Sequence, residues 1–163
     1  MRLAGVLLLS SLPIWIGIWS RQILQKRVNF LHTFARFIRF AKEQIRFSGR
    51  ELPEIFSLAL RSPVFSKPLW EELFCAVKDG QSVEKILKNR NDIRLKNEDI
   101  QMVSEFLSGL GTSDVEGQVE HAAYSLIQCE ELKKEAAHSF AVQGKLTVSL
   151  AGALAAALFI WMV

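Results

Sequence analysis

Apolar residues recur at steps of three and four through the middle of the chain, and this spacing predicts helices. Over residues 21–47 they form one stripe. A second set, which widens the apolar face toward a further partner, consists of Phe30, Phe37, Phe40 and Phe47. Shorter helices, separated by proline, glycine and polar residues, are predicted over 50–60, 67–79, 82–89 and 97–108. A long helix is predicted from about residue 114 onward. No segment of useful length alternates as a strand does, so the pattern predicts an all-α, antiparallel helical bundle.

Two apolar runs flank this charged middle, at residues 1–19 and 146–163. Both are almost free of charge and close to the length of about 20 residues that a helix needs to cross a bilayer. Trp15 and Trp19, followed by basic residues, are typical of a retained anchor, whereas a cleaved signal peptide would show a small-residue cleavage site. We therefore expect an N-terminal transmembrane helix, a helical domain over 20–145 and a C-terminal transmembrane helix.

Small residues recur four apart in the C-terminal run, which is a pattern that lets helices approach closely in lipid. These residues are Ser149, Ala153 and Ala157, with Gly152 and Ala156 beside them. The plainer interpretation is an alanine-rich helix. The spacing favours packing against the N-terminal helix or against a second copy of the chain.

Charge orients the two predicted spans. Residues 21–50 carry eight basic residues and one acid, so the excess of positive charge places the domain over 20–145 in the cytoplasm. The formal net charge of the 163 residues is only +3. This favours contact with anionic lipid headgroups and argues against nucleic acid as a partner. Cys75 and Cys129 have no metal-binding spacing, and in a reducing cytoplasm we expect both to be buried as small apolar residues.

The segment over 106–118, "FLSGLGTSDVEGQ", contains the chain's clearest motif. Gly109 and Gly111 have the spacing that opens a dinucleotide-binding loop, but they follow a helix, and Asp114 stands where the third glycine is required. An acid at that position would repel a phosphate. No Walker loop is present either, so nucleotide binding is excluded as an interpretation.

Metal binding and catalysis find little support in the same region. Glu116 and Glu120 share a helix face, and Asp114 and His121 roughly share another, but the two pairs do not converge. A charged helix start, which favours the helix dipole, is the simpler interpretation. No set of nucleophile, base and orienting group is visible. The sequence predicts no catalytic residue, no metal and no cofactor.

The motif therefore predicts a tight corner between two helices. A glycine stops the first helix, and Ser113 with Glu116 has the spacing of a capping box that starts the second. Gln118 lies one turn into the second helix, where its amide can reach back to the backbone of the loop. We expect the exposed Asp114 and its neighbouring backbone to contact a partner.

These features together resemble the stage III sporulation protein AB family. The family pattern of Leu-Gly-x-Ser-Asp followed by Gln is matched by Leu110, Gly111, Ser113, Asp114 and Gln118. Two terminal apolar segments around a helical middle match as well, and the resemblance covers the whole chain. More distantly, "GQSVEKIL" is similar to the Gly-x-Ser-x-x-x-x-Leu motif of F-type inner-membrane platform proteins of type II secretion and type IV pilus systems, through Gly80, Ser82 and Leu87.

The resemblance implies a non-enzymatic platform in the channel complex that links mother cell and forespore. It implies a location in the mother-cell membrane facing the forespore. The implied partners are the secretion-type ATPase stage III sporulation protein AA, other membrane proteins of the complex and the lipid bilayer, and association between copies stays open. The alternatives are a generic two-span interaction protein, a small membrane-bound hydrolase and a holin-like pore.

Overall fold

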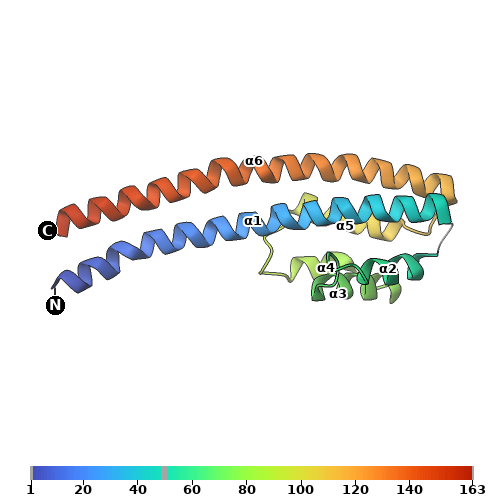
Figure 1. Ribbon diagram of the computed structural model, residues 1–163, viewed down its shortest axis with the longest axis horizontal. Coiled ribbons are helices and arrows are strands. Elements are labelled where there is room, and N and C mark those ends of the chain that lie inside the picture. The colour runs from blue at the N-terminus through green and yellow to red at the C-terminus, as the bar shows by residue number, and fades with distance from the viewer. Residues whose placement is uncertain (1, 49–50, 163) are drawn as a thin grey trace. The chain divides into compact units, whose positions relative to one another are not determined.

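The computed structural model describes the backbone of residues 2–48 and 51–162, and the side chains over 21–48, over 51–142 and at six later positions. The described residues form six helices and no strand, which confirms the predicted all-α fold (Figure 1). The helices are α1 (Arg2–Ser48), α2 (Leu52–Leu60), α3 (Pro68–Lys78), α4 (Val83–Lys88), α5 (Asn97–Gly109) and α6 (Val115–Met162).

The chain divides into two compact units. The first comprises residues 1–28 and 134–163, and the second comprises residues 29–133. In the first unit, Arg27 is buried and its guanidinium lies 3.9 Å from the Glu135 carboxylate. The Arg21 guanidinium lies over the Phe140 ring, 5.4 Å from its centroid. Since a buried charge needs a partner, these contacts join the α1 and α6 segments of this unit.

The predicted spans, 1–19 and 146–163, lie mostly on residues whose side chains are outside the described set. Within the described residues, no helix is at once long enough and apolar enough to cross a membrane. Where side chains of the C-terminal segment are described, the predicted packing residues are exposed: Ser149, Gly152, Ala153, Ala156 and Ala157.

The second unit is built around the phenylalanine face of α1. The Phe37 ring is fully buried and has six aromatic neighbours, with ring centroids between 5.0 and 6.2 Å away. They come from α1, α2, α3, α5 and the loop between α2 and α3: Phe34, Phe56, Phe65, Trp70, Phe74 and Phe106. Aromatic packing of this kind adds to the burial of apolar area. Phe47 of the second predicted set is an exception, because 77% of its surface is exposed.

Within this unit, the α1 and α6 segments run antiparallel and side by side (Figure 1). Near one end, the thiol of Cys129 lies 3.5 Å from the carbonyl oxygen of Leu31. Near the other end, Ile45 and Val115 line one pocket. Arg39 of α1 also donates to the Glu130 carboxylate of α6 at 2.6 Å. The first two contacts give the same register, so they fix which residues of the two helices lie at the same level.

Proline, glycine and serine set the ends of the short helices as their sequence positions predict. Pro53 and Pro68 lie in the first turns of α2 and α3, where a missing N–H costs nothing. Gly80 follows α3 with a φ of 65°, and the hydroxyl of Ser82 accepts from the N–H of Lys85 at 3.4 Å as the cap of α4. The motif of Gly80 and Ser82 therefore shapes a turn.

Candidate functional site

The corner between α5 and α6 is the candidate site. The connection covers residues 110–114, and Leu110 anchors it by being buried. Gly111 has a φ of 79°, a conformation that favours glycine. A Cβ atom at this position would also lie 2.7 Å from Cδ1 of Leu52, so any side chain here would require the end of Leu52 to shift. The predicted glycine-dependent corner is confirmed.

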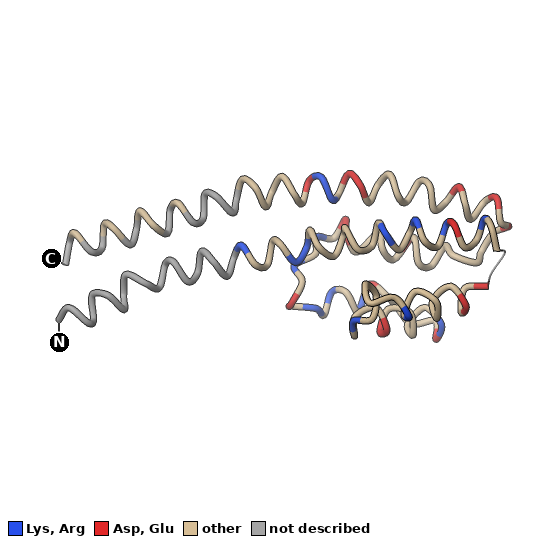
Figure 2. The backbone as a smooth tube through the Cα atoms, viewed as in Figure 1, with Lys and Arg blue, Asp and Glu red and all other residues tan. Residues whose placement is uncertain are grey.

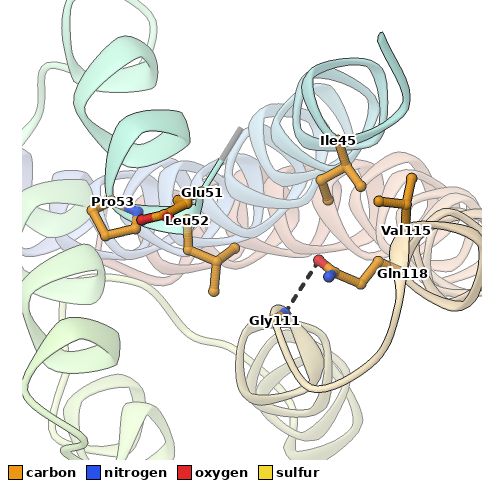
Figure 3. Close-up of a pocket in the computed structure, with 7 residues that line it drawn as sticks. All are labelled: Ile45, Glu51, Leu52, Pro53, Gly111, Val115 and Gln118. Atoms are coloured by element: carbon orange, nitrogen blue, oxygen red, sulfur yellow. Dashed lines mark hydrogen bonds between the residues drawn. The ribbon is translucent and has the colours of Figure 1, made fainter. Parts of the chain in front are cut away.

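Gln118 closes this corner with two hydrogen bonds, as its position predicted. The N–H of Gly111 donates to Oε1 of Gln118 at 3.2 Å (Figure 3). Nε2 of Gln118 donates to the carbonyl oxygen of Ser113 at 2.8 Å. One side chain of α6 therefore holds the loop from both sides. We call this pair of bonds the Gln118 latch.

The predicted capping box of Ser113 and Glu116 is wrong by one residue. The helix begins at Val115, so Asp114 occupies the cap position, and its Oδ1 accepts from the N–H of Gly117 at 3.0 Å. The carbonyl oxygen of Ser113 instead accepts one of the two hydrogen bonds of the Gln118 latch. Glu116 lies exposed in the first turn, where a carboxylate favours the helix dipole.

His121, which shares a helix face with Asp114 in the sequence pattern, has a packing position in the structure. Its ring stacks on Phe106 at 5.8 Å, and its buried Nε2 has no hydrogen-bond partner among the described residues. A Cβ at Gly109 would lie 2.5 Å from that Nε2, so this glycine lets α5 rest on the ring. No group of three or more metal-ligating side chains occurs among the described residues.

A pocket of about 360 Å³ opens beside the corner. It is lined by Ile45, Glu51, Leu52, Pro53, Gly111, Val115 and Gln118, which come from α1, from α2 and the residue before it, and from both sides of the corner (Figure 3). Most of this lining is apolar, and 50% of Val115 is exposed. Glu51, Asp114 and Glu116 are exposed in or next to lining segments and make the surroundings acidic. We call this feature the corner pocket.

A comparison with protein families finds a match over nearly the whole chain. The model of stage III sporulation protein AB matches residues 2–163. This chain belongs to the stage III sporulation protein AB family. No curated protein and no solved structure matches it. Family membership confirms the resemblance seen in the sequence and gives the chain a role in sporulation.

The five residues that carry the stage III sporulation protein AB pattern have distinct roles at the corner. Leu110 is buried and anchors the connection, and Gly111 supplies the positive φ of the turn. The carbonyl oxygen of Ser113 accepts a hydrogen bond from Gln118, whose side chain also accepts from Gly111. Asp114 caps α6. The pattern is therefore a folding motif that fixes the backbone beside the corner pocket.

Gly80 and Ser82 do not line the corner pocket. A second apolar pocket, of about 400 Å³, lies along α2 and α3 and shares Leu52 and Pro53 with the corner pocket. Cys75 lines it and is exposed, so the prediction that both cysteines are buried is wrong for Cys75. The prediction is confirmed for Cys129, where burial raises the pKa of the thiol to about 12.

The part of the site that α2 contributes was not predicted from the sequence. Glu51, Leu52 and Pro53 reach the corner only because α2 starts beside it. Pro53 gave a local signal for a helix start, but nothing in the spacing of these residues links them to Gly111. The buried Asp99 was also missed; its carboxylate accepts from the N–H of Lys96 at 2.8 Å at the start of α5.

Proposed function

We propose that this member of the stage III sporulation protein AB family is a non-enzymatic membrane platform in the complex between mother cell and forespore. It has two spans in the mother-cell membrane facing the forespore, and its domain over 20–145 lies in the cytoplasm. Its partners are the AA-type ATPase and other membrane proteins of the complex. Family membership, the two apolar ends and the basic residues next to the first of them support this proposal.

The observation that carries the proposal is the corner pocket held by the Gln118 latch. A binding site gains affinity when its shape is set before the partner arrives, because less conformational entropy is lost on binding. The latch and the positive φ of Gly111 fix the backbone on one side of the pocket. Asp114 adds a cap that fixes the start of α6.

The chemistry of the pocket indicates what the ATPase presents to it. An apolar lining accepts a leucine-sized or phenylalanine-sized side chain, whose burial contributes about 1.5–3 kcal/mol. The exposed carboxylates of Glu51 and Asp114 attract lysine or arginine on either side of that anchor. We therefore propose that the ATPase places an apolar residue flanked by basic residues in the corner pocket.

Val115→Glu tests this contact in the full chain in detergent. The substitution puts a carboxylate at the pocket wall, yet it lies in the first turn of α6, where negative charge favours the helix. We expect the purified AA-type ATPase to bind at least about tenfold more weakly, which corresponds to about 1.4 kcal/mol. Gln81→Glu adds the same charge at an exposed loop and is expected to leave the affinity unchanged. Equal affinities of the two variants would refute the corner pocket as the ATPase site.

The two cysteines test the membrane orientation separately. In intact cells, a membrane-impermeant maleimide is expected to leave the exposed Cys75 unlabelled, and permeabilisation should expose it to the reagent. Cys129 is expected to stay unlabelled in both cases, because it is buried and its raised pKa keeps it a thiol. Labelling of Cys75 in intact cells would place the domain outside the cytoplasm.

A further inference from the structure

The outward side of α6 in the second unit carries acids around two exposed apolar residues. This acidic face consists of Glu116, Glu120, Tyr124, Ile127 and Glu131, which follow one another at steps of three and four. Tyr124 and Ile127 are each 61% exposed, and the Tyr124 hydroxyl accepts a hydrogen bond from Gln128 at 3.1 Å. None of the three glutamates has an ion-pair partner among the described residues.

The charged residues of α1 in the same unit are mostly Lys and Arg (Figure 2), and several of them are exposed. This basic face consists of His32, Arg36, Arg39, Glu43 and Arg46, all exposed. Arg39 is occupied by Glu130 of its own chain. Arg36 and Arg46 have no carboxylate partner among the described residues, and the guanidinium of Arg46 lies over the ring of Phe47 at 5.4 Å. Each face therefore offers charges that have no ion-pair partner among the residues that the structure describes.

The two faces also match along the helix axes. Cys129 touches the carbonyl of Leu31, so these positions stand at one level. Because the helices are antiparallel, Arg36, five residues after Leu31, lies at the level of Tyr124, five residues before Cys129. In the same way, Arg46, fifteen residues after Leu31, lies at the level of residue 114. That level is two residues, or about 3 Å along the axis, from Glu116. Glu120 lies between these levels, about 6 Å from that of Tyr124.

We propose that the acidic face of one copy docks on the basic face of a second copy of this chain. Two parallel copies at the same height set Arg36 against the Tyr124 ring and Arg46 beside Glu116. The first contact is a cation–π pair and the second is an ion pair. Ile127 then packs on the aliphatic part of the neighbouring arginine side chains. The parallel orientation rests on the membrane anchoring proposed above.

The interface is heterologous, because it joins two different faces of the chain. A copy that uses its acidic face on one neighbour still has its basic face free for another. Repetition of such a contact produces a ring when the rotation closes and an open row when it does not. Either arrangement sets corner pockets in a regular series along the assembly.

A charge-swap experiment tests the pairing. The full chain is purified in detergent, and its mass is measured by size-exclusion chromatography with light scattering at low salt and at about 0.5 M salt. We expect the wild-type chain to associate at low salt and to dissociate at high salt. Glu120→Lys and Arg36→Glu are each expected to weaken association at least about tenfold, because each sets like charges against one another. An equal mixture of the two variants is expected to associate again, because the intact acidic face of the Arg36→Glu chain can dock on the intact basic face of the Glu120→Lys chain.

Two matched variants control for charge alone. Glu71→Lys and Arg94→Glu make the same changes at exposed positions outside both faces and are expected to associate like the wild-type chain. A wild-type chain that stays monomeric at low salt would overturn the proposal. So would a mixture of Glu120→Lys and Arg36→Glu that stays monomeric. The ATPase is absent from these measurements, so a failure of ATPase binding leaves their outcome unchanged.

Discussion

The Gln118 latch makes a strong test of how the corner is held, because one substitution removes both of its hydrogen bonds. Gln118→Leu keeps nearly the same side-chain size but can neither accept from Gly111 nor donate to Ser113. A hydrogen bond of this kind contributes about 0.5–1.5 kcal/mol. Gly111 is exposed, so water can satisfy part of what is lost. We therefore expect the free energy of unfolding to fall by about 1–2 kcal/mol.

Thermal unfolding of the full chain in detergent, followed by far-ultraviolet circular dichroism, measures this loss. For a cooperative unit of about 100 residues, the expected fall corresponds to a decrease in Tm of roughly 5–15 °C. The control is Gln101→Leu, the same substitution at an exposed position of α5 whose amide donates to Glu105 at 2.7 Å. Exposed pairs four residues apart contribute only about 0.2–0.5 kcal/mol. If Gln118→Leu lowers Tm no more than Gln101→Leu, the latch does not stabilise the corner.

Three further predictions concern single residues of the second unit. Gly111→Ala is expected to lower stability more than Gly80→Ala in the same melts, because both have positive φ but only a Cβ at Gly111 would also force the Leu52 side chain to shift. Asp114→Ala is expected to cost about 1 kcal/mol as a lost cap, and Ser113→Ala much less; equal losses would contradict the assignment of the cap. The pKa of the Cys129 thiol is about 12 in the folded chain, whereas its ordinary value of 9.0 applies in the unfolded chain. Between these two values the unfolded state binds fewer protons than the folded state. The free energy of unfolding is therefore expected to fall over this range by on the order of 1 kcal/mol per pH unit. Urea titrations should show this fall for the wild-type chain but not for Cys129→Ala.

Features with a local cause could be predicted from the sequence. The six helices follow from apolar spacing and from prolines and glycines, and the cap of α4 follows from a serine in the right place. The reach of Gln118 was predictable because one turn of helix fixes its distance from the loop. The cap of α6 was placed one residue early because Ser113 and Asp114 are both good caps, and only the observed backbone decides between them.

Features that depend on distant segments could not be predicted. The corner pocket needs Ile45, Leu52 and Val115, which belong to three helices with no common spacing. The exposure of Cys75 has the same origin. Its position on α3 suits an inward stripe, but the face is covered only on the side where Phe74 packs on Phe56 at 4.5 Å. Which side of a short helix is covered depends on its neighbours.

The late arrival of α6 has a consequence during synthesis. Leu31 contacts a residue 98 positions later, and Arg39 contacts one 91 positions later. At translation speeds of about 5–20 residues per second, roughly 5–20 s pass between the two segments. For that time the side of α1 that faces α6 in the finished unit stays open to chaperones, to lipid or to other nascent chains. Slower translation between residues 50 and 115 is therefore expected to lower the yield of folded protein without any change in its sequence.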